Sequence, residues 1–242
     1  MTETPSPSSS TTPPVHVPVA IVGGGPVGLS LALDLAWRGI RCLLLEKTDG
    51  AIRHPKTGHI AIRTMEYCRR WGLAQAVRDS GFPEDYKLDV VFCTSLTGHL
   101  LSRREYPSTA DEPLPPQSPE KRQRAPQLYF DPILARAVAR RPEAEVRYHC
   151  EVLSFEDRGD RVHGRARDLA SGSDFDFSAD WMVGCDGPGS MVRQSLGIAM
   201  EGDGALSHSV GIYFRSPGLT RAHAWARRCV TCSSVRKACG AT

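Results

Sequence analysis

The feature that most constrains this chain is a glycine-rich turn directly after a short apolar run. Residues 17–22 read Val-Pro-Val-Ala-Ile-Val, and Gly23-Gly24-Gly25-Pro26-Val27-Gly28 follows at once. Such a run is typical of a buried parallel strand, and proline suits the first turn of a helix because its missing N–H has no partner there. A helix capped by Gly39 and a second apolar strand over 41–45 complete a strand–helix–strand unit. The chain is therefore predicted to be an α/β protein.

The same turn has the spacing that binds dinucleotides, with glycines at positions 23, 25 and 28. Gly23 permits the tight turn, Gly25 lets the backbone approach a pyrophosphate, and Gly28 lets helix and strand pack closely. The helix start at Pro26 and Val27 offers N–H groups and a positive partial charge to phosphates.

An acidic residue stands where such a unit binds the adenosine ribose. Glu46 follows the second strand, 18 residues after Gly28, and its carboxylate can accept hydrogen bonds from ribose hydroxyls. A carboxylate there disfavours a 2′-phosphate, although the neighbouring Lys47 weakens that argument. Because the motif serves both nicotinamide and flavin cofactors, the turn alone leaves the cofactor open.

Composition and charge exclude several classes of function. Thirty Lys and Arg against 27 Asp and Glu give a net charge of +3, and the basic residues are scattered, so nucleic acid is not an expected partner. No apolar run reaches the length of about 18 residues that a membrane span needs. The eight cysteines form no dense framework, which favours a reduced, cytoplasmic protein. The histidines are dispersed, and we predict no metal site and name no catalytic acid or base.

Farther along, the patterns predict a helix over 62–72, a hairpin of strands 88–93 and 99–106, and an exposed loop over 107–126. Asp131 and Pro132 resemble an N-cap and first helical position, so a helix is expected to begin there and to end before Pro142. Further strands are expected over 146–156, 161–168 and 180–184. Residues 1–16, rich in Ser, Thr and Pro, are expected to be a disordered leader.

The stretch from Asp180 to Arg193, Asp-Trp-Met-Val-Gly-Cys-Asp-Gly-Pro-Gly-Ser-Met-Val-Arg, resembles a fingerprint of the FAD-dependent aromatic hydroxylases. These are single-component flavoprotein monooxygenases of the para-hydroxybenzoate and phenol hydroxylase type. In that family an Asp-Gly pair, here Asp186 and Gly187, follows a buried strand near the FAD pyrophosphate and is implicated in NAD(P)H use.

Other stretches from about Val19 to Phe214 match the family in order and spacing. Lys56 and Arg63 fall in the segment that is similar to the family's helix beside the flavin, with Lys56 where many members carry Arg. Gln127 resembles the glutamine that contacts the flavin's sugar-like chain, and Val152 lies where a backbone group meets the adenine. The resemblance thus implies a Rossmann-like FAD-binding domain with a β-meander insertion and a partial β-sheet substrate domain.

The implied reaction is hydroxylation of a small aromatic, phenol-like substrate with O₂ and NADPH or NADH. The family's third fingerprint, a Gly-Asp motif, has no counterpart after Gly187, so the chain looks like a C-terminally truncated member. Two alternatives stay open: a non-catalytic FAD-binding remnant, and a nicotinamide-dependent reductase. The sequence indicates neither the oligomeric state nor the identity of the aromatic compound.

The expected domain division follows from this family resemblance. Residues 17–200 form the FAD-binding domain, with 85–125 contributing a hairpin and loop to the substrate side. Residues 201–223 begin the substrate domain, and 224–242 are an atypical tail. Cys229 and Cys232 in that tail have metal-site spacing but lack a second pair, so they predict no zinc site.

Overall fold

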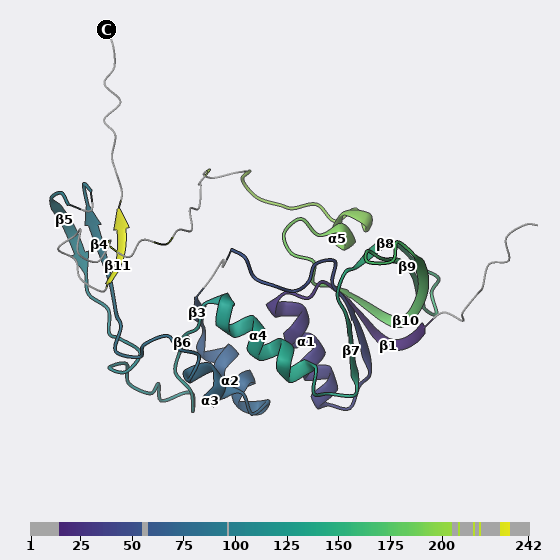
Figure 1. Ribbon diagram of the computed structural model, residues 1–242, viewed down its shortest axis with the longest axis horizontal. Coiled ribbons are helices and arrows are strands. Elements are labelled where there is room, and N and C mark those ends of the chain that lie inside the picture. The colour runs from purple at the N-terminus through teal and green to yellow at the C-terminus, as the bar shows by residue number, and fades with distance from the viewer. Residues whose placement is uncertain are drawn as a thin grey trace, which may run out of the picture. The chain divides into compact units, whose positions relative to one another are not determined.

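The structure, a computed structural model, describes residues 15–54, 58–95, 97–204, 208, 215, 218 and 228–232. The chain divides into two compact units, whose helices and strands are labelled in Figure 1. The first combines residues 1–51 with 134–201, and the second combines 52–133 with 202–242. The domain division expected from the sequence stays a prediction. In the described part of the chain, no helix is both long enough and apolar enough to cross a membrane.

The first unit begins with the predicted strand–helix–strand motif. Strand β1 (Val15–Val22), helix α1 (Pro26–Trp37) and strand β2 (Cys42–Leu45) follow in that order. β1 and β2 pair in parallel, with Val22 opposite Leu45. Pro26 stands at the start of α1, and Gly39, which follows the C-cap residue Arg38, has a φ of 76°. The structure therefore confirms the α/β class and both helix-boundary signals.

The remaining strands of this unit complete a mixed six-stranded sheet in the order β7-β2-β1-β10-β9-β8. β7, β2, β1 and β10 run parallel, whereas β9 pairs antiparallel with both β10 and β8. The sheet is thus a parallel Rossmann-like half extended by an antiparallel meander. The bounds are β7 (Ala144–Arg147), β8 (Cys150–Asp157), β9 (Val162–Asp168) and β10 (Asp174–Gly184).

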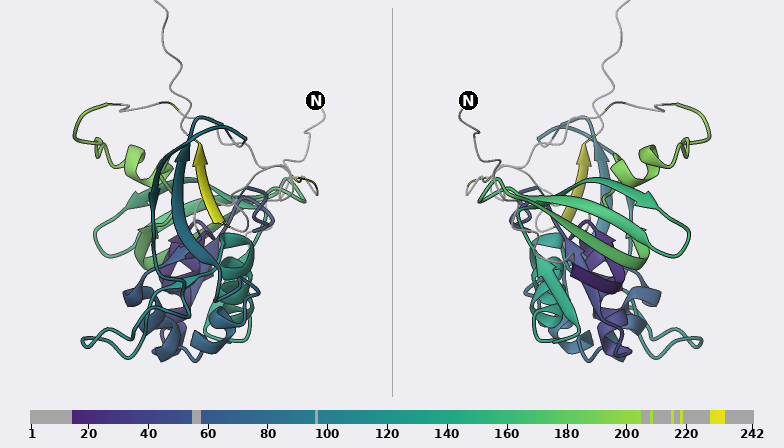
Figure 2. Two further views of the ribbon diagram at one scale, coloured as in Figure 1. Left: turned by 90° about the vertical axis from the view of Figure 1, so that its left-hand side faces the viewer. Right: turned by 90° about the vertical axis from the view of Figure 1, so that its right-hand side faces the viewer.

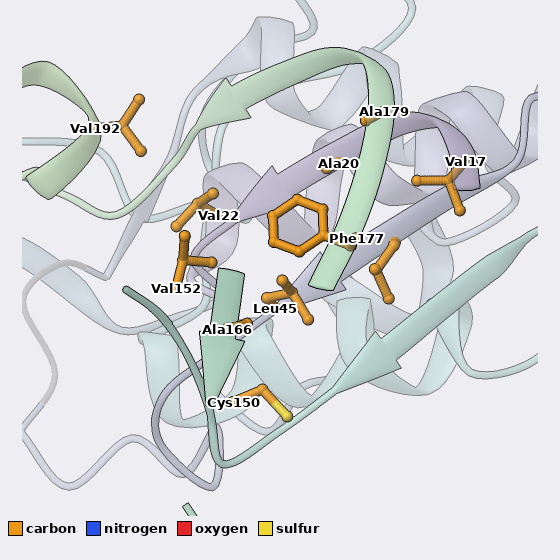
Figure 3. Close-up of a cluster of buried hydrophobic side chains, with 11 residues drawn as sticks. Val17, Ala20, Val22, Leu45, Cys150, Val152, Ala166, Phe177, Ala179 and Val192 are labelled. Atoms are coloured by element: carbon orange, nitrogen blue, oxygen red, sulfur yellow. The ribbon is translucent and has the colours of Figure 1, made fainter. Parts of the chain in front are cut away.

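A buried cluster joins the parallel half to the meander (Figure 3). Phe177 of β10 is 1% exposed, and its ring stands over Gly164 of β9, where a Cβ would collide with the ring atoms. Glycine at 164 is therefore needed to leave room for the tip of the aromatic ring on the neighbouring strand. Around this ring, the cluster gathers apolar side chains from both halves of the sheet and from the short helix α5 (Met191–Ser195), namely Val17, Ala20, Val22, Leu43, Leu45, Cys150, Val152, Ala166, Ala179 and Val192.

Helix α1 packs on the sheet through one apolar face. Its buried residues are Gly28, Leu29, Ala32, Leu33 and Ala36. The buried Cys42 thiol of β2 lies 3.9 Å from the Ala32 carbonyl oxygen, which places the strand directly beside the helix. Three small residues in this face, a glycine and two alanines, allow that close approach. The helix start is thereby fixed against the ends of the central strands.

The second unit holds two small sheets and two short helices. β4 pairs antiparallel with β5, as the predicted hairpin requires, and β11 adds to β4 in parallel (Figure 2). The second sheet pairs β3 with β6. The bounds are β3 (His59–Ile60), α2 (Ile62–Arg70), α3 (Ala74–Arg78), β4 (Lys87–Cys93), β5 (Leu100–Arg104), β6 (Gln123–Arg124) and β11 (Arg228–Cys232).

The start of helix α4 (Gln127–Val138) differs from the prediction. The helix begins four residues before Asp131, and Pro132 lies inside it. Asp131 cannot act as a cap because its side chain is buried, 3% exposed, and its carboxylate accepts no hydrogen bond from the described residues. The first turn is closed instead by the Pro126 carbonyl, which accepts hydrogen bonds from the N–H groups of Tyr129 and Phe130.

The segment 107–126 is only in part the exposed loop that its proline and charge content predicted: 110–111, 113–114 and 116–117 are exposed, but other residues are buried and 123–124 form β6. Glu120 is 1% exposed and forms ion pairs with Arg69 of α2 and Arg78 of α3. Ser118 is buried too, and its hydroxyl donates to Glu66 at 2.7 Å. Charged partners far away in sequence therefore bury residues that local composition assigns to solvent.

Two strand boundaries also differ from the sequence patterns. The single strand expected over 146–156 is two strands, β7 and β8, which lie at opposite edges of the sheet. His149 separates them with a φ of 55°, a left-handed conformation that ends the first strand. The strand expected over 180–184 is the last part of the longer β10, which starts at Asp174. β11 was not expected from the sequence.

Candidate functional site

Three chain segments meet at the carboxyl edge of the parallel strands in the first unit. The Gly23 N–H donates to the Leu45 carbonyl at 2.9 Å, so the glycine turn crosses the end of β2. The Cys185 N–H donates to the Val22 carbonyl at 2.7 Å, which brings the end of β10 to the same turn. In open α/β sheets this edge is where ligands bind. It assembles the glycine turn, Glu46 and the Asp186-Gly187 pair.

Each glycine of the motif has a distinct reason to lack a side chain. Gly23 has a φ of 106°, and a Cβ there would lie 2.5 Å from the Cys185 carbonyl oxygen. A Cβ on Gly28 would collide with the Gly23 carbonyl oxygen. Gly25 differs, since a Cβ built on it meets nothing within 4 Å. The protein itself therefore does not require glycine at 25, whereas a ligand that approaches the backbone closely does.

The start of α1 offers an anion site next to Gly25. Gly25 is the N-cap and supplies no side-chain acceptor to the first N–H groups of the helix, and the first turn holds no acidic residue. Val27 is 67% exposed at this position, so the first turn faces open space. N–H groups that lack a side-chain cap, together with the helix dipole, favour phosphate oxygens.

Glu46 stands at the centre of the assembly, half-buried after β2. One carboxylate oxygen, Oε2, accepts a hydrogen bond from the Gly24 N–H at 2.6 Å. The other, Oε1, accepts from the N–H of Thr48 at 2.8 Å and from its hydroxyl at 2.6 Å. A Cβ on Gly24 would lie 2.8 Å from the Glu46 Cβ, so the middle glycine is needed for this contact. Gly24 and Thr48 were not among the predicted site residues.

The pKa of Glu46 lies below its ordinary value. Burial opposes ionisation, but the hydrogen bonds from Thr48 and Gly24 and the charge of Lys47 outweigh it and lower the pKa. Glu46 is therefore a fixed anion at neutral pH. Lys47 is exposed, and its charge contributes to that result. A fixed carboxylate suits hydroxyl donors and repels a phosphate.

Asp186 supports the start of the short helix α5, whose N-cap is Ser190. Its Oδ2 accepts hydrogen bonds from the N–H groups of Met191 at 2.7 Å and Val192 at 3.2 Å. Burial opposes ionisation, but hydrogen bonds from Ser190 and from these N–H groups lower the pKa of the carboxyl below its ordinary value. The other oxygen, Oδ1, is buried and finds no hydrogen-bond partner in the described part of the chain. A buried acceptor of this kind fits a bound group or water.

Two further predicted residues frame this edge. Gly187 is exposed and has a φ of 82°, a conformation that favours glycine at the turn after Asp186. Val152 is 7% exposed and packs in the buried cluster. The ladder with β9 shifts register after Val152, which leaves Leu153 without a paired residue and 37% exposed. The predicted backbone contact of Val152 with adenine stays a prediction.

The remaining predicted residues belong to the second unit or fall outside the described residues. Arg63 lies in α2, where it donates to Glu66 at 2.7 Å and its guanidinium lies 4.9 Å from the centre of the Tyr67 ring. Gln127 opens α4 and is 8% exposed. Lys56 lies outside the described residues. The structure therefore brings together the predicted nucleotide-binding residues of the first unit, and the predicted flavin contacts of the second stay predictions.

Comparison with known proteins gives a consistent result. A family model described as an FAD binding domain matches residues 16–238. A 4-methyl-5-nitrocatechol 5-monooxygenase from a Burkholderia species is 36% identical over 210 residues, which cover 85% of this chain and 37% of the relative. An aklavinone 12-hydroxylase from Streptomyces peucetius is 36% identical over 209 residues, which cover 83% of this chain and 41% of the relative. The chain therefore spans about two fifths of the length of these relatives.

A solved structure shares the fold. The flavin-dependent monooxygenase PieE, in complex with FAD and substrate, superposes with a TM-score of 0.71 at 30% identity. The match covers 79% of this chain and 34% of that one. The described fold is therefore similar to that of a protein solved in complex with FAD.

Proposed function

This chain belongs to the family of FAD-dependent aromatic hydroxylases, and from that premise we propose that it binds FAD and serves the NAD(P)H- and O₂-dependent hydroxylation of a small aromatic compound. The observation that supports this most directly is that one sheet edge holds both Gly25, beside which the space is unobstructed, and the hydrogen-bonded Glu46 carboxylate. The first admits a pyrophosphate, and the second accepts a hydrogen bond from a ribose.

The residues of the first unit fit the ADP half of FAD. The start of α1 would hold the pyrophosphate, because its N–H groups have no side-chain cap and Gly25 leaves room for close approach. Glu46 would bind the adenosine ribose through Oε2, which accepts one hydrogen bond from the protein. The anion at Glu46 disfavours a 2′-phosphate at this position, so NADP(H) is not expected to occupy the glycine turn.

Asp186 and Gly187 would border the pyrophosphate from the end of β10. The unpartnered Oδ1 of Asp186 supports this assignment. Arg63, Gln127 and Lys56 are proposed to serve the flavin half of FAD, on the strength of the family resemblance. The aromatic, phenol-like substrate and the choice between NADPH and NADH are proposals of the same kind, supported by the names of the relatives.

When bound, FAD supplies the redox chemistry that reduces O₂ and transfers one oxygen atom to the aromatic ring. The residues of this chain bind and orient the cofactor. Glu46 would bind the ribose and the α1 start would bind the adjoining pyrophosphate of the ADP group, and the hydrogen bonds at Asp186 fix the turn after β10. We assign no catalytic acid or base to the described residues.

The experiment is a flavin titration of the purified chain, followed by absorbance and by quenching of flavin fluorescence. We expect wild type to bind FAD and Glu46→Ala to weaken binding by about 1.5–3 kcal/mol, because the ribose loses a charged acceptor. Glu156→Ala is the matched control, since Glu156 is an exposed acid of β8 in the same unit.

The outcomes separate the candidate functions. A chain that binds NAD(H) but no flavin would be a nicotinamide-dependent protein, and the proposal would be wrong. A chain that binds FAD but neither oxidises NAD(P)H nor modifies any of a panel of phenols would be a binding protein without the proposed reaction. Equal FAD affinity of wild type and Glu46→Ala would remove Glu46 from the binding site.

A further inference from the structure

Thr48 is a polar residue at the site that the sequence motif does not include. It lies two residues after Glu46, in the exposed loop that follows β2. Both its N–H, at 2.8 Å, and its hydroxyl, at 2.6 Å, donate to Oε1 of Glu46. One residue thus occupies an entire carboxylate oxygen of the side chain proposed to bind ribose.

Thr48 is itself held from two sides. Its hydroxyl oxygen accepts a hydrogen bond from the Gly50 N–H at 3.2 Å, and its carbonyl accepts one from the His149 N–H at 3.0 Å. Gly50 has a φ of 74°, and a Cβ there would lie 2.5 Å from a ring carbon of Tyr148. The loop is therefore fastened to the turn between β7 and β8, and the Thr48 hydroxyl is oriented before any ligand arrives.

A count of the acceptor sites on the Glu46 carboxylate shows how many remain for a ligand. An ionised carboxylate has about four lone-pair sites, two on each oxygen. Thr48 fills both sites of Oε1, and the Gly24 N–H fills one site of Oε2. One site remains, on Oε2, beside the glycine turn. The side chain can therefore offer a single directed hydrogen bond to a ribose hydroxyl.

We infer that Thr48 is a positioning residue for dinucleotide binding, which fixes the Glu46 carboxylate so that Oε2 alone is presented to the ribose. This inference rests on the proposed function, in which Glu46 accepts a ribose hydroxyl. Preorganisation of this kind raises affinity because the side chain loses no rotamer freedom on binding.

The charges around Glu46 define a readout that does not require a cofactor. Burial opposes ionisation of Glu46, and Thr48, Gly24 and Lys47 lower its pKa. Burial and, to a smaller extent, the Glu46 charge raise the pKa of Tyr148. Loss of the Thr48 hydroxyl leaves the burial in place, so the pKa of Glu46 must rise.

The test compares Thr48→Val, which removes the hydroxyl, with Thr48→Ser, which keeps it. The Glu46 carboxyl is titrated by carbon-13 NMR of glutamate-labelled protein without cofactor, with its signal assigned through Glu46→Gln. FAD titrations of the same proteins follow, and thermal unfolding reports whether the variants fold. Ser171→Ala removes an exposed hydroxyl from the β9–β10 turn and serves as the control.

We expect Thr48→Val to raise the pKa of Glu46 and to weaken FAD binding by about tenfold, equivalent to about 1.4 kcal/mol. Thr48→Ser and Ser171→Ala should match wild type in both measurements. A wild-type Glu46 titration in a folded Thr48→Val protein would overturn the inference, whatever the FAD affinity.

A raised pKa with unchanged FAD affinity would equally overturn the positioning role, because the hold on Glu46 would then be irrelevant to the nucleotide. If wild type binds no FAD, the proposed function fails by itself, and with it the ligand assigned to this carboxylate. The cofactor-free titration would still decide whether Thr48 fixes Glu46.

Discussion

The buried carboxyl of Asp131 should make the stability of this protein fall as the pH rises through the mildly acidic range. Burial raises its pKa from 3.8 to about 6. The unfolded chain exposes this group to water, where it ionises near its ordinary pKa. Between these two values the folded state holds a proton that the unfolded state has lost, so protonation stabilises the fold.

The size of the effect follows from the two pKa values. The interval from 3.8 to about 6 corresponds to about 3 kcal/mol of unfolding free energy, present below the lower value and lost once the pH exceeds the upper one. Most of the change in unfolding free energy between pH 5 and pH 7 should therefore vanish in Asp131→Asn, which cannot ionise. The carboxylate accepts no hydrogen bond from the described residues, so replacing it by an amide breaks no hydrogen bond to them.

Urea unfolding at pH 5, 6, 7 and 8 measures this difference. Asp176→Asn is the matched control, because Asp176 lies exposed on β10 and stays in water on folding. The comparison is between pH slopes rather than absolute stabilities, so any uniform effect of the amide cancels. If Asp131→Asn keeps the wild-type slope between pH 5 and pH 7, the assignment of a raised pKa to this carboxyl is wrong.

The other predictions concern the glycine turn and the second unit. Gly25→Val should keep the wild-type circular dichroism spectrum yet lose FAD binding, because a Cβ there meets no protein atom within 4 Å and the side chain would occupy the space proposed for the pyrophosphate; retained affinity would contradict the phosphate-loop assignment. Gly28→Ala should instead lower the unfolding midpoint, since its Cβ collides with the Gly23 carbonyl. Glu120→Ala should lower the free energy of unfolding by urea by about 1.5–3 kcal/mol, because Arg69 and Arg78 lose a charged partner; wild-type stability would show that these two ion pairs contribute nothing.

The parts of the fold that the sequence predicts well are those whose determinants are local. Pro26 and Gly39 mark the ends of α1 by their own backbone chemistry, independently of what surrounds them. The Asp131-Pro132 pair shows the limit of that approach, because the same residue types serve inside α4 when the aspartate is buried. Whether an aspartate caps a helix or enters a core depends on tertiary packing, which a short sequence window does not contain.

Burial within the second unit could not be predicted from the local sequence, for a related reason. Ser118 and Glu120 are buried by Glu66, Arg69 and Arg78, which lie about forty to fifty positions earlier in the chain. A proline-rich, charged segment normally indicates an exposed loop. The helices α2 and α3, which supply the opposite charges, bury part of this segment. Neither composition nor spacing predicts which residues of the helices and the segment will pair.

At the candidate site, spacing predicted Glu46 but not the residues that hold it, and strand register explains the difference. Parallel pairing sets Val22 opposite Leu45, so the residues that follow these two must lie side by side at the sheet edge. The glycine turn and the acid are therefore neighbours in any fold that keeps this register, which is why their spacing is informative. The hydrogen bonds of Thr48 and Gly24 depend on the conformation of the loop after β2, which the turn at Tyr148 and His149 stabilises from a distant part of the chain. A one-residue shift in the pairing of β2 with β1 would move Glu46 away from Gly24 and break the hydrogen bond between them, even with the glycine motif unchanged.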